Sequence, residues 1–356
     1  MNLDRLLPKL GEWLRSTGPE SDVVVSTRIR LARNLADHPF TSRATLHQKT
    51  EIEAKLRDCV TRLELENPLS YIEISHLEPL ERQFLVERQL ISRELANVME
   101  GPRGAAFDER ESVSLMINEE DQLRLQVLRS GLALESAWDE INHIDDLIEA
   151  KLTYAFHEQF GYLTACPTNV GTGMRASVML HLPALGLTKQ IEKAFKALQK
   201  INLVVRGLYG EGSRASGDFY QISNQVTLGK SEASALADIR EVITEIMRYE
   251  RLARSALVRE NRKSLHDRVA RAVGTLQSAT MMTSEETMEL LSSVRLGIDL
   301  KLLDEVPLPL VNELFLHSQP AHLQKLMGEP LDGEARNAAR ARYLRSRLRE
   351  LGASTN

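Results

Sequence analysis

The feature that most constrains the fold is a run of β-branched residues near the N-terminus that ends in positive charge. Residues 22–30 read Asp-Val-Val-Val-Ser-Thr-Arg-Ile-Arg, and Gly18-Pro19 precede them. Such a run predicts a buried strand. Because successive side chains of a strand point to opposite faces, Arg28 and Arg30 are expected to share one face. The chain must therefore build a sheet and carry arginines on it.

Other segments supply the rest of this sheet and the helices that cover it. Apolar alternation predicts further strands at 112–118, 123–128, 177–182, 203–208 and 219–228. Residues 41–99 are predicted to be helical, and so are residues 188–199. Apolar residues at helical spacing from Leu134 to Leu152 predict an amphipathic helix against the sheet. This mixture predicts an α+β fold.

The character of the chain changes after Ser231, a predicted N-cap, where apolar residues adopt a long helical spacing and strand signals become scarce. Thr283 and Glu286 have the spacing of a capping box for a later helix. We therefore predict two domains, a mixed sheet-and-helix domain over residues 18–250 and an all-helical domain over residues 251–356.

Composition narrows the functional classes. The chain has 356 residues and a formal net charge of -5, which gives no global attraction to nucleic acid or membrane. Its two cysteines, Cys59 and Cys166, lie far apart, which argues against a disulfide framework and favours a reducing compartment. Residues 1–18 mix charges with leucines, unlike a signal peptide. A cytoplasmic location is expected.

Two glycine-containing segments imitate nucleotide motifs without completing them. Residues 228–231 resemble the end of a P-loop, but Asn224 stands where its first glycine is required. Residues 171–176 match a dinucleotide fingerprint, but a strand rather than a helix is predicted to follow. The histidines show no metal-ligand spacing, so no protein-held metal is expected.

Arginines stand at strand ends or beside glycine-rich turns. The members of this set are Arg28, Arg30, Arg124, Arg175 and Arg206. A forked, permanently charged guanidinium suits phosphate oxygens, although any single arginine is as readily a solvated surface residue. The set gains meaning from the carboxylates near it.

Carboxylates occur in two separate segments. Residues 118–121 read Asn-Glu-Glu-Asp at a predicted turn, and Glu211 lies in a glycine-rich loop that follows Arg206. Two carboxylates could hold a guanidinium bidentately, orient one nitrogen and accept its proton. Phosphoryl transfer then needs positioning and charge neutralisation, the work of arginines and Mg²⁺.

Four segments in order resemble the signatures of phosphagen (guanidino) kinases. They are Ser26-Thr27-Arg28-Ile29-Arg30, Asn118-Glu119-Glu120-Asp121, the stretch from Cys166 to Thr172, and Arg206-Gly207-Leu208-Tyr209-Gly210-Glu211. Residues 223–225 and 229–231, with the helical C-terminal part, are similar to the McsB branch of bacterial protein arginine kinases. The resemblance implies a catalytic domain with an antiparallel sheet flanked by helices, followed by an all-helical domain for dimerisation and regulation.

The resemblance also implies a set of site residues. Glu120 and Glu211 would clamp and deprotonate the substrate guanidinium, with Cys166 beside it. ATP-binding residues would be Ser26, Thr27, Arg28, Ile29, Arg30, Gln89, Arg124, Arg175, Ala176, Ser177, Val178, Met179, Arg206, Gly207, Leu208, Tyr209, Gly210 and Glu211. The nucleotide itself would hold Mg²⁺.

Three positions depart from the pattern of the family. Arg336-Asn337-Ala338-Ala339-Arg340-Ala341 stands where the phosphoarginine-binding motif Arg-Asp-x-x-Arg-Ala is expected, so its acidic member is missing. The alternative for this segment is a basic, solvated helix. Gln89 and Gln122 each replace an expected histidine and cannot carry positive charge, which predicts weaker or differently pH-dependent nucleotide binding.

The resemblance implies an ATP-dependent protein arginine kinase that marks proteins for a Clp ATPase and protease and controls a heat-shock repressor. A zinc-finger activator protein and a homodimer are implied partners, and Leu290, Leu291, Val294 and Leu296 could serve either a core or a dimer contact. Two alternatives stay open at this point: a kinase of free small guanidines, and a non-catalytic adaptor of a repressor or protease.

Overall fold

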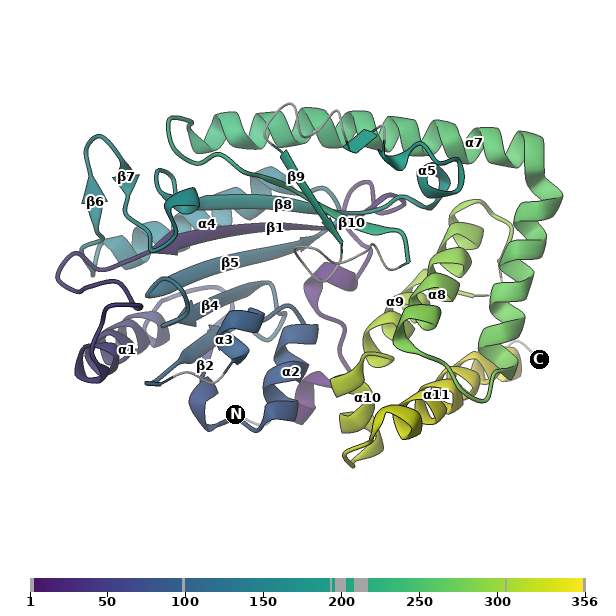
Figure 1. The fold of residues 1–356 in the computed structure, drawn as a ribbon, viewed down its shortest axis with the longest axis horizontal. Coiled ribbons are helices and arrows are strands. Elements are labelled where there is room, and N and C mark those ends of the chain that lie inside the picture. The colour runs from purple at the N-terminus through teal and green to yellow at the C-terminus, as the bar shows by residue number, and fades with distance from the viewer. Residues whose placement is uncertain are drawn as a thin grey trace.

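The computed structural model describes residues 3–97, 100–192, 194–195, 203–207, 217–304 and 306–354. Its centre is an eight-stranded sheet with the strand order β2-β3-β4-β5-β1-β8-β10-β9 (Figure 1). Every neighbouring pair in this sheet is antiparallel. The strands are β1 Val24–Arg33, β2 Ser70–Glu73, β3 Gly104–Phe107, β4 Val113–Ile117, β5 Leu123–Ser130, β8 Met174–His181, β9 Leu203–Gly207 and β10 Phe219–Asn224. A separate hairpin pairs β6 Phe156–His157 with β7 Gly161–Tyr162.

Helices pack against both faces of the sheet and continue into a C-terminal bundle. The α-helices are α1 Leu46–Thr61, α2 Pro79–Glu87, α3 Arg93–Ala96, α4 Leu134–Glu149, α5 Pro183–Leu187, α7 Glu232–Ser278, α8 Ser284–Asp299, α9 Leu308–His317, α10 Pro320–Met327 and α11 Gly333–Ser354. Short 3₁₀ helices lie at η1 Leu3–Leu6, η2 Glu12–Leu14, η3 Ile74–His76 and η4 Pro167–Asn169. Figure 1 shows α7 along the sheet before it turns toward α8 to α11.

The two faces of the sheet differ in chemistry because side chains alternate along each strand. Ile29, Val127 and Val178 are fully buried in one core cluster with residues of α4 and α7. On the opposite face, Arg30 of β1 pairs in register with Arg175 of β8. One face therefore builds the main core, and the other carries arginines in the centre of the sheet.

The C-terminal helices close one end of the arginine-bearing face. Met179 and Phe219 belong to a second core cluster with residues of α8 and α9, and the Phe219 ring lies 5.0 Å from that of Phe315 in an edge-to-face contact. This contact leaves the other end of the face, around Arg30 and Arg175, uncovered by the helical bundle.

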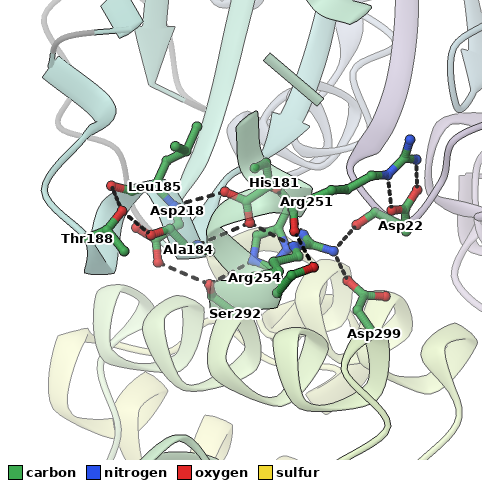
Figure 2. Close-up of polar contacts among 12 residues, drawn as sticks. Asp22, His181, Ala184, Leu185, Thr188, Asp218, Arg251, Arg254, Ser292 and Asp299 are labelled. Atoms are coloured by element: carbon green, nitrogen blue, oxygen red, sulfur yellow. Dashed lines mark hydrogen bonds and ion pairs between the residues drawn. The ribbon is translucent and has the colours of Figure 1, made fainter. Parts of the chain in front are cut away.

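Buried polar contacts fix the long helix α7 between the sheet and the bundle (Figure 2). Glu250 of α7 accepts hydrogen bonds from the backbone N–H groups of Ala184 and Leu185 at the start of α5, at 3.1 and 2.9 Å. Arg254, one turn later, donates to Glu250 at 2.7 Å and pairs with Asp299 of α8 at 3.2 Å. Because these charges are buried and paired, they fix the orientation of α7 against both neighbours.

Most predicted elements are confirmed, including the α+β class, the hairpin strands β4 and β5, and both predicted N-caps. Ser231 caps α7, and Thr283 caps α8 by accepting a hydrogen bond from the backbone N–H of Glu286 at 3.1 Å. The continuous helical prediction for residues 41–99 is wrong, because β2 interrupts it, and β3 was missed. Both strands are only four residues long, which is too short for a clear alternation.

Two predictions about boundaries remain predictions. The helix expected at 188–199 lies partly outside the described residues, and the described helix α5 ends at Leu187. The domain division at residue 250 falls inside α7, whose backbone leaves the helical region at Asn261, with φ −134° and ψ 28°. Across the described ranges, we find no helix with the length and apolar character needed to cross a membrane.

Candidate active site

A cleft of about 980 Å³ opens on the uncovered part of the arginine-bearing face. Strands, loops and the segment around α3 all contribute to its walls. The lining residues are Arg30, Thr41, Ser42, Lys49, Glu94, Asn97, Glu100, Pro102, Arg103, Asn118, Glu119, Glu120, Arg124, Ala165, Cys166, Thr168, Asn169, Arg175 and Arg206. Cationic and acidic side chains therefore meet in one concave site that is large enough for a nucleotide and part of a second substrate.

The cationic wall comes from four adjacent or nearly adjacent strands. Register places Arg30 opposite Arg175 and Arg124 opposite Ala32, while Arg206 of β9 pairs with Gln221 of β10. These positions share one face, so the sheet brings together arginines that lie up to 176 residues apart in sequence, from Arg30 to Arg206. Four of the five arginines singled out in the sequence therefore line the cleft, and Arg28 lines a small separate cavity.

Arg28 is held by two neutral side chains. One terminal nitrogen donates to Oε1 of Gln89 and the other to Oε1 of Gln221, each at 2.9 Å. Burial lowers the pKa of Arg28 to about 10, and three neighbouring arginines add to the effect. Neutral amides orient this guanidinium without cancelling its charge, so it remains available to attract an anion.

Arg30 shows the same electrostatic need for an anion. Burial, followed by repulsion from Arg28 and Arg124, lowers its pKa well below the ordinary value, and Glu119 only partly offsets the effect. A polyphosphate would relieve this repulsion, because its oxygens carry the opposite charge and accept hydrogen bonds from several guanidinium groups. The wall is therefore suited to the phosphates of a nucleotide.

The adjacent carboxylates Glu119 and Glu120 have different surroundings. Glu119 is 3% exposed and accepts hydrogen bonds from Arg124 at 2.5 and 2.6 Å and from the hydroxyl of Ser92. Burial opposes its charge, but Arg124 outweighs this effect with the help of Ser92 and holds the pKa of Glu119 below its usual range. Glu119 is therefore ion-paired with Arg124 and is not available to bind a substrate.

Glu120 is exposed in the same cleft and is the carboxylate that can reach a substrate. Partial burial raises its pKa, and repulsion from Asp121 adds to the rise while Arg124 opposes it. Asp121 itself is buried and accepts hydrogen bonds from Asn34 and from the backbone N–H of Ala165, both at 2.7 Å. A carboxylate whose basicity is raised in this way is better able to accept a proton.

Cys166 also lines the cleft, at the N-cap position of η4. Its sulfur is 3.0 Å from the hydroxyl of Thr168, and the hydroxyl of Thr164 donates to its backbone carbonyl at 2.7 Å. Because the side chain is only partly buried, it can contact a bound substrate. This position fits the role beside the guanidinium that the resemblance implied.

The two glutamines in place of histidine have separate environments. Gln89 contacts Arg28 directly, whereas Gln122 is fully buried and binds the backbone of a neighbouring loop. Gln122 accepts from the N–H of Leu35 at 2.8 Å and donates to the carbonyl of Pro39 at 2.9 Å. Gln122 therefore has a structural contact set in this chain, and only Gln89 lies beside the cationic wall.

The remaining residues predicted to bind ATP lie on both faces of the sheet. Ser26, Ser177 and Met179 line a small cavity beside Arg28, and Gly207 ends β9. The side chains of four other residues lie on the core face or support the backbone: Thr27, Ile29, Ala176 and Val178. Leu208, Tyr209, Gly210 and Glu211 lie outside the described residues.

The segment that resembles a phosphoarginine motif lies in α11. Arg340 is buried and donates to the carbonyls of Ser318 and Met282, both at 2.8 Å, and to Oδ1 of Asn337 at 2.9 Å. Arg336 donates to the carbonyl of Leu331 at 2.9 Å, and Ala341 belongs to the C-terminal core. Arg340 thus ties α11 to the C-terminal end of α9 and to the segment that precedes α8. A phosphoarginine-binding role for this segment stays a prediction.

Sequence reasoning missed two residues that shape the cleft. Gln221 orients Arg28, and Ser92 donates to Glu119. Gln221 directly precedes the core residue Ile222 in β10, so its position on the opposite face of the sheet could have been inferred from the strand pattern. Ser92 caps the short helix α3 by accepting from the N–H of Leu95, and no local signal indicates its second contact.

Comparison with known proteins agrees with this geometry. The family described as ATP:guanido phosphotransferase, C-terminal catalytic domain, matches residues 51–253, and the Protein-arginine kinase McsB C-terminal domain matches residues 262–356. Among solved structures, the duplicated taurocyamine kinase from Schistosoma mansoni with bound transition state analog components has a TM-score of 0.61 and 26% identity, and covers 69% of this chain and 35% of its own. The structure of lombricine kinase has a TM-score of 0.59 and 25% identity, and the match covers 70% of this chain and 71% of lombricine kinase. Fold and cleft together define a phosphotransferase of the guanidino class.

Relatives of nearly full length narrow this class. The protein-arginine kinase of Halothermothrix orenii is 46% identical over 349 residues, which cover 98% of this chain and 99% of the relative. That of Brevibacillus brevis is 47% identical over 340 residues and covers 95% of each chain. The chain belongs to the McsB family of protein-arginine kinases, which confirms the resemblance read from the four signature segments.

Proposed function

We propose that this protein transfers the γ-phosphoryl group of ATP to the guanidinium groups of arginine residues in proteins. The observation that carries the proposal is that arginines suited to bind phosphate and an exposed carboxylate face the same cleft. Arg30, Arg124 and Arg175 form a cationic wall, and Glu120 is an exposed carboxylate with a raised pKa beside it. Full-length similarity to protein-arginine kinases supports a protein as the acceptor.

The reaction follows from the placement of these groups. The arginine wall would hold the ATP phosphates, while Glu120 would accept a proton from the attacking guanidinium nitrogen. A nitrogen–phosphorus bond forms as the bond between the γ-phosphorus and its bridging oxygen breaks, and ADP leaves. The guanidinium is a weak nucleophile, so removal of its proton and alignment with phosphorus supply most of the rate enhancement. Glu211 is proposed as the second carboxylate that holds the substrate guanidinium. Cys166 is proposed to contact the same guanidinium.

Mg²⁺ is proposed to enter on the nucleotide. Among the described residues, no three or more acidic, histidine or cysteine side chains are grouped so that they could hold a metal ion. The donor chemistry of the cleft instead fits an anionic nucleotide that brings its own cation. When bound, Mg²⁺ would neutralise phosphate charge that the arginines leave exposed.

Cellular partners are proposed from family membership. They are a zinc-finger activator protein, a Clp ATPase and protease that receives the marked proteins, and a heat-shock repressor that is controlled by phosphorylation. We also propose a homodimer built by the C-terminal helices and a cytoplasmic location. The absence of a disulfide framework from the sequence is consistent with a reducing compartment.

The test is phosphorylation of a protein substrate by the purified enzyme. Wild type, Glu120→Gln and Glu211→Gln would be incubated with Mg-ATP and casein, with free arginine in a parallel reaction, and analysed by mass spectrometry for acid-labile phosphoarginine. We expect phosphoarginine on casein with wild type and a loss of at least about a hundredfold in each variant. Phosphate on free arginine alone would assign a small-guanidine kinase, and no product from wild type with an activator present would favour an adaptor.

A further inference from the structure

The end of α2 and the start of α10 meet in a buried junction of hydrogen-bonded polar groups. Glu87, the last residue of α2, accepts hydrogen bonds from the backbone N–H groups of Ala321 and His322 at 2.8 and 3.0 Å. These two groups belong to the first turn of α10, where N–H groups have no partner within the helix. Glu87 therefore caps a helix of the C-terminal bundle from the catalytic half of the molecule.

The imidazole of His322 joins two consecutive residues of α2 in a defined protonation state. Arg88 donates to Nε2 of His322 at 3.2 Å, and Nδ1 of His322 lies 2.8 Å from a Glu87 oxygen. Because a guanidinium can only donate, Nε2 must accept, so the proton sits on Nδ1 and points at Glu87. Burial, with repulsion from Arg88, lowers the pKa of His322 well below its ordinary value, in agreement with this neutral form.

Arg88 is locked on its other sides as well. It donates to both carboxylate oxygens of Glu111, one at 2.9 Å and one at 2.5 Å, and to the carbonyl of Lys9 at 2.8 Å. Arg88 and His322 are both fully buried. The backbone at residues 87–88 therefore has very little freedom to move independently of α10.

Gln89 directly follows Arg88 in the chain and connects this rigid backbone segment to the cationic wall. Its backbone has φ +63°, a left-handed conformation that ends α2 and aims the side chain toward the sheet. Gln126 of β5 donates to its carbonyl at 2.6 Å, and its Oε1 accepts from Arg28 at 2.9 Å. An unbroken set of contacts thus runs from α10 through residues 87–89 to Arg28.

We infer that Glu87 is a positioning residue for nucleotide binding, because its cap on α10 fixes Gln89 and thereby orients Arg28 toward the phosphates. The inference rests on the proposed ATP-dependent function and deepens it. It makes the seating of the C-terminal helices a condition for tight ATP binding, although no residue of α10 belongs to the cleft. The acidic side chain acts through Gln89 and never touches the nucleotide.

The chain offers a matched control for the loss of such a cap. Glu250 is buried, as Glu87 is, and it also accepts hydrogen bonds from two consecutive backbone N–H groups at a helix start, those of Ala184 and Leu185. It pairs with Arg254, as Glu87 pairs with His322. Its contacts lead to α5 and α8, so its loss should cost stability without disturbing Arg28.

The experiment compares Glu87→Gln, Gln89→Ala, the double variant and Glu250→Gln in the full-length protein. KM for ATP, KM for the protein substrate and thermal midpoint are measured at pH 8, above the pKa of about 7 to which burial raises Glu87. We expect Glu87→Gln to raise KM for ATP about fivefold, the effect of one lost hydrogen bond, and to leave KM for the protein substrate unchanged. Glu250→Gln should lower the thermal midpoint with no change in either KM.

The double variant decides whether Glu87 acts through Gln89. If it does, Glu87→Gln adds nothing to KM for ATP once Gln89 is alanine, because the link is already broken. Additive effects, or an unchanged KM for ATP in Glu87→Gln, would overturn the inference. An inactive wild type would instead refute the proposed function, and equal effects of Glu87→Gln and Glu250→Gln on KM would show a general consequence of lost stability.

Discussion

Arg124 grips both carboxylate oxygens of Glu119 with one guanidinium nitrogen, at 2.6 and 2.5 Å, inside the wall of the cleft. This pair separates two neighbouring glutamates that the sequence presents as equivalent. Glu119 is occupied and Glu120 is exposed, so the same substitution should have different consequences at the two positions.

Glu120→Gln should lower kcat by about a hundredfold to ten-thousandfold, the usual contribution of a general base, with an unchanged thermal midpoint. Glu119→Gln should instead destabilise the fold by about 3 kcal/mol, because it leaves Arg124 without its buried partner. Steady-state kinetics and thermal unfolding of both variants would distinguish these outcomes. A stable, inactive Glu119→Gln beside an active Glu120→Gln would reverse the assignment.

The pH dependence of kcat should report the environment of Glu120. As pH falls through the raised pKa of this carboxyl, Glu120 gains a proton and can no longer accept one, so kcat should fall at a higher pH than an ordinary glutamate would give. Asp121→Asn removes the repelling charge and should move the acidic limb to lower pH. An acidic limb that stays in place in this variant would show that Asp121 does not contribute to the raised pKa of Glu120.

Arg28→Lys should raise KM for ATP about tenfold, because one ammonium cannot meet both Gln89 and Gln221 and still present a planar fork to phosphate. KM for the protein substrate should stay within twofold of the wild-type value. Arg259→Lys, an exchange at an exposed position of α7, is the matched control and should change neither constant. Equal losses in both KM values would point to a wider disturbance of the cleft.

Gln89→His tests the consequence of a glutamine beside the arginine wall. Imidazole changes charge near neutral pH, whereas the amide does not, so the pH dependence of ATP binding in the variant should differ from that of wild type. Calorimetric titration with ATP between pH 6 and pH 8 would measure it. ATP affinity identical to wild type throughout this range would contradict the prediction.

Gly217→Ala should destabilise the protein more than Gly229→Ala. Both glycines have positive φ, +65° and +74°, so each substitution should cost about 1 kcal/mol in backbone strain. A Cβ on Gly217 would also come within 2.6 Å of the carbonyl oxygen of Met288, whereas nothing lies within 4 Å at Gly229. Urea unfolding of both variants would measure the difference, and equal destabilisation would show that the backbone at Met288 yields without cost.

Much of the fold was predictable from local pattern, because long strands and amphipathic helices carry their periodicity in a single segment. The strand at the N-terminus, the hairpin strands β4 and β5, and the capped starts of α7 and α8 were all visible in this way. The four-residue strands β2 and β3 were not, since pairing with their neighbours rather than their own composition places them in the sheet.

The candidate site was predictable as a set of residue types but not as a division of roles. The placement of arginines at predicted strand ends indicated Arg28 and Arg30, and the resemblance to guanidino kinases implied Glu120. It did not show that Gln221 orients Arg28 or that Ser92 and Arg124 occupy Glu119, because these contacts join segments that only the folded sheet brings together.

By itself, the sequence determined the secondary structure with strong periodicity, the residues that cap α7 and α8, and the chemical types available for the site. These properties depend on backbone geometry and on neighbours within a few residues. The tertiary structure alone decided which arginine faces which, which of two adjacent glutamates remains exposed, and how α10 reaches Gln89. Those outcomes depend on burial and on contacts between residues more than 200 positions apart, such as Glu87 and His322. A buried polar group loses its hydrogen bonds to water, so it requires a partner within the folded protein.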